Sequence, residues 1–170
     1  MLKNKGLTLV EIMISAAILS TALTGILMFN SQYIKELQET RNLSLAMNAA
    51  QERFEKIKSR VNPQDATETT KIDFNNLAQY YNGLTFDIYG NNKTTALTNF
   101  KGVSYVKEVT GLPLKMFRVR VLVCWKNSQN QVMGEDANLN GALDTGEDKN
   151  NNSELDSPAF VQADLINMEQ

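Results

Sequence analysis

The residues best suited to chemistry in this chain are oxygen donors at alternating positions of one short segment, 136–147. The expected ligands are five side chains and one backbone carbonyl, that of Ala142, and they are Asp136, Asn138, Asn140, Ala142, Asp144 and Glu147. Gly141 stands at the sixth position, where the chain must turn sharply. A hard cation such as Ca²⁺ takes about six to eight oxygen ligands, and alternate residues around a tight loop supply them. The spacing therefore predicts a calcium site.

The order of these residues resembles the calcium-binding loop of EF-hand proteins. In that loop the ninth residue, here Asp144, often acts through a water, and the twelfth, here Glu147, is a bidentate ligand. Leu143 at the eighth position is expected to point inward. No amphipathic helix flanks the segment, so the resemblance is to calcium loops on a different scaffold. The alternative is a solvated acidic loop, because Asn and Asp also favour turns.

The pattern begins again at once, with a period of twelve residues, so that calcium-type loops span 136–159. The second copy has oxygen-bearing side chains at Asp148, Asn150, Asn152, Glu154 and Asp156. Ser153 replaces the glycine, and Ala159 takes the twelfth position, so this copy lacks its own bidentate carboxylate. Two alternatives stay open: a weaker second site, or one completed from outside the loop. Without a cation, only Lys149 offsets the acidic side chains of the two copies.

Other chemistry has little support in the composition. The chain has no histidine and a single cysteine, Cys124, so the side chains of zinc sites and hydrolytic triads are nearly absent. No nucleophile stands with a base, and no phosphate-cradling loop is present. Trp125 and Cys124 are interpreted as a core residue and an inert thiol. A net charge of −2 gives no reason to expect a nucleic-acid partner, and we expect no enzymatic activity.

Glu11 is the only ionisable residue in the apolar segment 7–29. The segment is long enough to cross a bilayer, which takes roughly 20 residues. Lys3 and Lys5 in front of it would keep that end in the cytoplasm. A signal peptide is cut after its apolar core, whereas the plausible cleavage point here, Gly6, lies before it. Cleavage there would give Leu7 a new α-amine one turn from Glu11, and a buried carboxylate needs such a counter-ion.

The run from Gly6 to Glu11, followed by an apolar helix, resembles the class III signal of type IV prepilins and type II secretion pseudopilins. The resemblance implies that a prepilin peptidase cuts after Gly6 and methylates Leu7. It also implies that Glu11 pairs with the N-terminal amine of an adjacent subunit during assembly. Leu7 departs from the usual phenylalanine, and Met28 stands where major pilins often have proline. The alternative is the signal anchor of an unrelated single-pass protein.

The elements that position these residues divide the chain into four parts. We expect a leader at 1–6, a membrane or filament-core helix at 7–29, an amphipathic continuation at 30–62, and a head domain at 63–170. Apolar residues at helical spacing run from Ala46 to Val61, and the residue before Pro63 ends the helix. Strands with period-2 alternation are expected at 84–89, 103–110, 117–126 and 160–166, with a short helix at 73–81. The fold class is α+β, with an antiparallel sheet packed on the second half of the long helix.

The function that these parts predict is that of a structural subunit of a type IV pilus or type II secretion pseudopilus, stabilised by calcium. The segments 49–55 and 124–126 look similar to V-type minor pilins and the I-type minor pseudopilin, which favours a minor subunit. Its partners would be other pilin subunits and the prepilin peptidase. The chain would lie in the inner membrane with its head in the periplasm, and then in the filament. A major pilin is the alternative, and a membrane-anchored, calcium-dependent binding module or enzyme is the other.

Overall fold

The computed structural model describes residues 8–61, 71–90 and 94–166. The chain divides into two compact units, Met1–Glu39 and Thr40–Gln170, each of which is described by itself. The long helix α1 (Leu9–Val61, 53 residues) begins in the first unit and ends in the second. Its last residue agrees with the predicted end before Pro63, although Asn62 and Pro63 themselves lie outside the described residues.

The described part of the first unit, residues 8–39, is the N-terminal part of α1 with Thr8 in front of it. Its large apolar side chains, from Leu9 to Leu37, are exposed. Hydroxyl groups on this stretch donate hydrogen bonds to backbone carbonyls one turn earlier, as from Ser15 to Glu11 and from Thr24 to Ser20. Such bonds satisfy hydroxyls that lipid could not hydrate. Among the described residues, α1 is the one helix that is long and apolar enough to cross a membrane.

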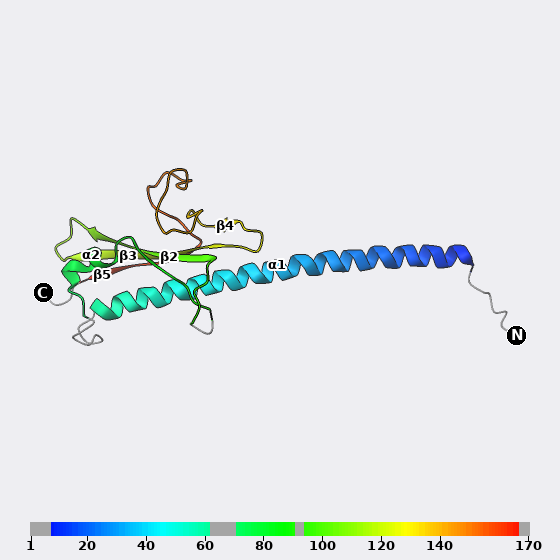
Figure 1. The fold of residues 1–170 in the computed structure, drawn as a ribbon, viewed down its shortest axis with the longest axis horizontal. Coiled ribbons are helices and arrows are strands. Elements are labelled where there is room, and N and C mark those ends of the chain that lie inside the picture. The colour runs from blue at the N-terminus through cyan, green and yellow to red at the C-terminus, as the bar shows by residue number, and fades with distance from the viewer. Residues whose placement is uncertain (1–7, 62–70, 91–93, 167–170) are drawn as a thin grey trace. The chain divides into compact units, whose positions relative to one another are not determined.

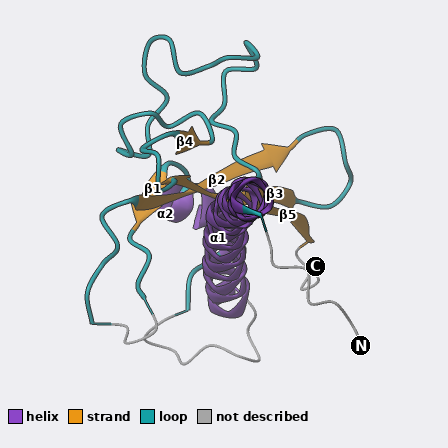
Figure 2. Ribbon diagram, turned by 90° about the vertical axis from the view of Figure 1, so that its right-hand side faces the viewer, coloured by secondary structure: helices purple, strands orange, loops and turns teal. Residues whose placement is uncertain are grey.

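The second unit is an antiparallel sheet with the end of α1 on one face (Figures 1 and 2). Its strands are β1 (Leu84–Phe86), β2 (Phe100–Val109), β3 (Met116–Lys126), β4 (Val132–Met133) and β5 (Ala159–Ile166). The central strand β3 pairs with β2 along one edge. Its other edge pairs with β5 over Met116–Val123 and with β4 at Trp125 and Lys126. A 3₁₀ turn (Phe74–Asn76) and the short helix α2 (Leu77–Tyr81) precede β1.

The main core lies between α1 and the sheet. The helix contributes Ala46, Ala50, Phe54 and Ile57, and β3 contributes Phe117, Val119, Val121, Val123 and Trp125, all buried in one cluster. This confirms the predicted apolar faces of both elements. Burying a large apolar side chain stabilises the fold by about 1.5–3 kcal/mol. The packing therefore fixes β3 against the helix.

A second, smaller core lies on the opposite face of the sheet. Val103, Leu122, Cys124 and Leu155 are buried there, with Leu139 and Leu143 packed against them. Leu139, Leu143 and Leu155 come from the segment 136–159, which covers this face (Figure 2). Leu143 and Leu155 hold the eighth position of the first and second copies. The prediction that Leu143 points inward is thus confirmed, and this second core packs the segment against the sheet.

The strands differ from the sequence prediction in their bounds and in their number. The strand expected at 84–89 ends at Phe86, and Tyr89 forms only an isolated bridge with Ala96. Leu84 on this strand is 43% exposed, and β1 lies at the edge of the sheet. β2 begins at Phe100 instead of Val103, since its first residues pair with Trp125 and Cys124 at the end of β3. β4 was not predicted.

Candidate functional sites

Loop 1, residues 136–147, is closed by its first and last carboxylates. Asp136 is 1% exposed, and its two oxygens accept hydrogen bonds from the backbone N–H groups of Asn140 (3.0 Å) and Gly141 (2.7 Å). Glu147 accepts bonds from the N–H groups of Ala137 (2.9 Å) and Asp144 (3.0 Å). The predicted first and twelfth ligands therefore lie inside the loop and define its shape.

The interior of loop 1 is filled by amides. The side-chain nitrogens of Asn138 and Asn140 donate to Asp144 Oδ2 at 2.7 and 2.8 Å. Their side-chain oxygens accept the N–H groups of Asn140 and Ala142. Within the described ranges, no three His, Cys, Asp or Glu side chains converge as a metal-ligand group. The calcium site at Asp136, Asn138, Asn140, Ala142, Asp144 and Glu147 thus stays a prediction.

The charge of loop 1 nevertheless suits a cation. Burial raises the pKa of Asp136, and the neighbouring charge of Glu147 acts in the same direction. Among the residues that the structure describes, no Lys or Arg forms an ion pair with Asp136, Asp144 or Glu147. Carboxylates, amide oxygens and carbonyls are the donors that Ca²⁺, Mg²⁺ and Mn²⁺ prefer. Turning the two Asn amides would direct their oxygens inward.

Loop 2, residues 148–159, repeats the side-chain hydrogen bonds that the first, third, fifth and ninth residues make in loop 1. Asp148 accepts the N–H groups of Asn152 (3.0 Å) and Ser153 (2.8 Å), as Asp136 does in loop 1. The side chains of Asn150 and Asn152 donate to Asp156 Oδ2 at 2.7 and 2.6 Å. The repeat that the sequence indicates is therefore structural.

The backbone of the two loops follows the same repeat. The fourth residues, Leu139 and Asn151, have φ values of 60° and 58°. The sixth residues, Gly141 and Ser153, have φ values of 80° and 62°. A left-handed conformation costs a non-glycine residue roughly 1–2 kcal/mol. Ser153 therefore adopts the glycine conformation of loop 1, at an energetic cost that Gly141 avoids.

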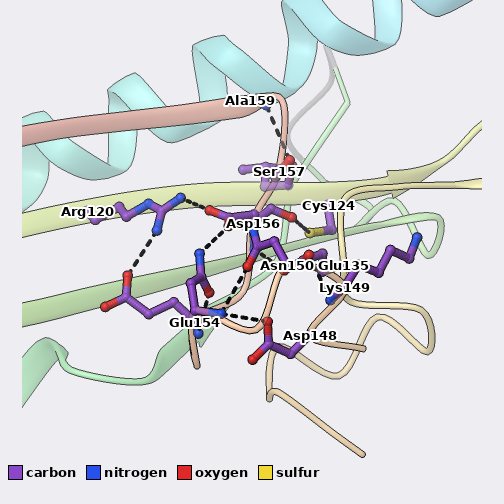
Figure 3. A network of polar contacts seen from close by, with 12 residues as sticks. Arg120, Cys124, Glu135, Asp148, Lys149, Asn150, Glu154, Asp156, Ser157 and Ala159 are labelled. Atoms are coloured by element: carbon purple, nitrogen blue, oxygen red, sulfur yellow. Dashed lines mark hydrogen bonds and ion pairs between the residues drawn. The ribbon is translucent and has the colours of Figure 1, made fainter. Parts of the chain in front are cut away.

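Ion pairs tie loop 2 to the outer face of the sheet (Figure 3). Arg120 on β3 binds Glu154 at 3.0 Å and also pairs with Asp156, and Lys107 on β2 pairs with Glu154. The bond from Lys107, followed by that from Arg120, lowers the pKa of Glu154. Burial would raise the pKa of Asp156, but bonds from Asn150, Arg120 and Asn152 outweigh it and lower that pKa. Sequence reasoning named Lys149 alone and missed both strand residues.

The sequence analysis also missed Glu135, which is 7% exposed and lies just before loop 1. Its N–H group donates to the carbonyl of Asp156 at 2.8 Å, so it closes the base of the two-loop segment. The sequence does carry a signal for this residue, since Glu135 stands twelve positions before Glu147, at the same place in the repeat.

At the other end of the chain, Glu11 caps the helix in which it lies. Thr8 Oγ1 accepts the N–H group of Glu11 at 3.3 Å, while Glu11 Oε2 accepts the N–H group of Thr8 at 3.3 Å. This reciprocal pair is a capping box. The carboxylate therefore has partners within its own chain, whereas the sequence analysis looked for one only at an N-terminal amine. Gly6 and Leu7, the predicted processing residues, lie outside the described residues.

Comparison with known families identifies this end of the chain. Residues 1–27 match the prokaryotic N-terminal methylation motif. The chain carries the class III signal of type IV pilins and pseudopilins. The match includes Gly6, Leu7 and Glu11, and it fits a membrane-anchored, pilin-like subunit that assembles with other pilin subunits. Comparisons with curated proteins and with solved structures each gave no significant match.

The fold agrees with that signal. A long apolar N-terminal helix followed by a small antiparallel sheet is a pilin-like α+β architecture. The lone thiol adds no competing chemistry, because burial raises the pKa of Cys124 and so disfavours the reactive thiolate.

Proposed function

We propose that the chain is a minor subunit, pilin or pseudopilin, of a type IV pilus or type II secretion pseudopilus. The observation that carries the proposal is the methylation motif over residues 1–27, followed by a helix apolar enough to span a bilayer. Before assembly, the subunit is anchored in the inner membrane with its sheet domain in the periplasm, and it is then incorporated into a filament. Its role is structural, without catalytic activity.

In this proposal, prepilin peptidase cuts after Gly6 and the new amine of Leu7 is methylated. Glu11 then exchanges its partners. In the isolated chain it accepts two hydrogen bonds from Thr8, at 3.3 and 3.4 Å, which are long. An ammonium would add a full opposite charge to the bond, which the neutral N–H and O–H groups of Thr8 lack, and a carboxylate in an apolar setting needs such a counter-ion. The amine of an adjacent subunit therefore competes well for Glu11 during assembly.

The assignment as a minor subunit rests on two features. Met28 replaces the proline that often kinks the helix of major pilins. The segment 49–55, which resembles minor pilins and pseudopilins, supplies Ala50 and Phe54 to the main core. Within it, the Arg53 guanidinium lies 5.3 and 5.2 Å from the ring centroids of Tyr81 and Phe86. Scarcity of the chain in purified filaments would support a minor role, and abundance would indicate a major pilin.

We further propose that loop 1 binds calcium and that this holds β5 in the sheet. The support is the set of oxygen donors and the buried carboxylate of Asp136, which forms no ion pair with Lys or Arg among the described residues. The two loops connect β4 to β5, and Ser157 near the end of loop 2 donates to the carbonyl of Val123 on β3. A cation that orders the loops would therefore stabilise the last strand against the central one.

Processing is the first test. The intact mass of the membrane-extracted chain should correspond to a start at Leu7 plus one methyl group. Gly6→Val should block cleavage and leave the leader attached, because a bulky side chain replaces the glycine at the cut. A mature chain that begins at Met1, or beyond Phe29, would contradict the proposal.

The role of Glu11 is tested by two substitutions that separate charge from capping. Glutamine completes a capping box as glutamate does, but it carries no charge. If the charge pairs with an amine, Glu11→Gln and Glu11→Ala should both insert and be cleaved normally, and both should enter filaments poorly. If capping alone matters, Glu11→Gln should assemble like the wild type while Glu11→Ala does not. The second result would refute the proposed pairing.

A further inference from the structure

Glu135 makes the same two contacts to loop 2 that Glu147 makes to loop 1. Its Oε1 accepts the N–H group of Lys149 and its Oε2 that of Asp156, both at 3.1 Å. Lys149 and Asp156 are the second and ninth residues of loop 2. Glu147 accepts from Ala137 and Asp144, the second and ninth residues of loop 1. Each carboxylate therefore closes one loop in the same way, and Figure 3 shows Glu135 beside Lys149 and Asp156 of loop 2.

The two glutamates hold equivalent places in the sequence but serve loops on opposite sides. Glu135 and Glu147 each stand directly before the first aspartate of a copy. Glu147 closes the loop that precedes it. Glu135 reaches across the base of the segment to the later loop, because its backbone bond to Asp156 brings the beginning and the end of the segment together. Glu147 thus closes loop 1 and Glu135 closes loop 2. Loop 2 therefore does not need a carboxylate at its own twelfth position, where Ala159 stands.

We infer that Glu135 is the missing bidentate carboxylate of loop 2, so that the paired loops hold two calcium ions. The inference rests on the calcium binding proposed above and concerns the second copy. The ligands of the second site are Asp148, Asn150, Asn152, the carbonyl of Glu154, Asp156 and Glu135. They match the donor types of loop 1 position by position, and a bidentate glutamate is the ligand that the sequence of loop 2 lacks.

Burial supports a cation beside Glu135. The residue is 7% exposed, as is Glu147, and within the described ranges neither forms an ion pair with Lys or Arg. A buried carboxylate is costly unless a cation or a set of strong hydrogen bonds compensates it. The backbone bonds compensate part of that cost. A divalent ion between Glu135 and Asp148 would supply the remaining positive charge.

The second site should be the weaker one. Arg120 already occupies one oxygen of Asp156, and Lys107 and Arg120 neutralise Glu154. Loop 1 has no such basic partner among the described residues, and its sixth residue is a glycine instead of the less favourable Ser153. Calcium loops of extracellular modules bind at about 10⁻⁴–10⁻³ M. We place loop 1 toward the tight end of that range and loop 2 toward the weak end.

Calcium titration of the full-length chain in detergent tests the inference. Isothermal titration with CaCl₂, with stoichiometry checked by equilibrium dialysis, should give two ions for the wild type. Glu135→Gln and Asp148→Asn should each leave one, the tighter. Glu147→Gln should also leave one, the weaker. Glu108→Gln removes an exposed carboxylate of β2 and should leave two. Loss of a ligand should weaken its site by at least about 10-fold.

The outcomes separate this inference from the proposal beneath it. Two ions in Glu135→Gln, or one ion in the wild type that Glu135→Gln does not disturb, would overturn the role of Glu135 and leave loop 1 intact. No calcium in the wild type would overturn the proposed calcium binding as well. If circular dichroism shows that Glu135→Gln is unfolded, Glu135→Asp keeps the charge on a shorter arm. An unchanged second affinity in that variant would refute the inference.

Discussion

Arg120 joins loop 2 to the sheet, and its removal should have opposite effects on stability and on the response to calcium. Its side chain is 15% exposed and contacts Glu154 and Asp156, and its guanidinium lies 5.3 Å from the ring centroid of Phe160 on β5. Arg120→Gln removes the charge while keeping a polar side chain. Without calcium, Asp156 loses its only basic partner among the described residues, and the sheet loses its hold on the loop.

The size of the loss follows from these contacts. A hydrogen bond to a charged group contributes roughly 1.5–3 kcal/mol. The two acidic side chains are 28% and 29% exposed, and Glu154 keeps Lys107, so solvent and the remaining pair reduce the total. We expect the free energy of unfolding of Arg120→Gln in chelator to be about 2 kcal/mol lower than that of the wild type. For a unit the size of Thr40–Gln170, that corresponds to a fall in Tm of about 6–10 °C.

The response to calcium, in contrast, should increase when Arg120 is replaced. Asp156 no longer shares an oxygen with Arg120, so the second cation meets a more negative site and binds more tightly. The rise in Tm on adding calcium should therefore be larger in Arg120→Gln than in the wild type. The fluorescence of Trp125, which lies in the main core, reports unfolding of the detergent-solubilised chain in EDTA and in CaCl₂.

Arg118→Gln is the matched control. Arg118 is two residues away on β3 and pairs with Asp164 on β5 at 2.8 and 3.0 Å. Its partner Asp164 lies outside the two loops, and the side chain of Arg118 is exposed to solvent. This variant should lose little stability and respond to calcium as the wild type does. The reasoning is refuted if Arg120→Gln melts like Arg118→Gln in EDTA, or if its calcium-dependent rise in Tm shrinks.

Three further changes test the packing and the cation. Gly102→Ala should lower the free energy of unfolding by about 1–2 kcal/mol in chemical denaturation, because the new methyl group would lie only 2.5 Å from two ring atoms of Phe86 on β1. Adding Phe86→Ala should relieve that overlap. Equal losses in the single and double variants would refute this cause. Chelation should lower Tm by several degrees, since a ligand at ten times its Kd contributes about 1.4 kcal/mol, and Glu147→Gln should remove most of that shift; identical melting curves with and without calcium would return loop 1 to a solvated turn. Ile57→Ala should cost about 2–5 kcal/mol by equilibrium unfolding, because the side chain is fully buried, and a loss below about 1 kcal/mol would contradict the helix–sheet packing.

Periodicity accounts for the parts of the fold that could be predicted from sequence. The stripe from Ala46 to Ile57 and the alternation along β3 each bury one face, so the pattern specifies both the element and its orientation. Strand ends were less accessible. β4 has two residues and depends on pairing with Trp125 and Lys126, which local propensity does not encode. The exposure of Leu84 reflects its place at the sheet edge, a property of the whole topology.

The functional residues divide along the same line. The predicted ligands of loop 1 can be proposed from sequence because they are close together in the chain and fixed in spacing. The pairing of Arg120 with Asp156 joins residues 36 positions apart, and only the strand register brings them together. Glu135 combines both kinds of information, since its position in the repeat is visible in the sequence but the loop that it closes is not. The capping box at Thr8 and Glu11 was readable from spacing alone and was overlooked because the charge invited a partner outside the chain.

The bond between the N–H group of Glu135 and the carbonyl of Asp156 means that the two-loop segment leaves the sheet and returns to it at one point. A segment whose ends already meet imposes no change of distance on the strands that flank it, and the entropy of closing a loop grows only slowly with its length. Evolution could therefore lengthen or shorten this segment without moving the strands on either side, provided that its leucines still cover Val103, Leu122 and Cys124 on the sheet.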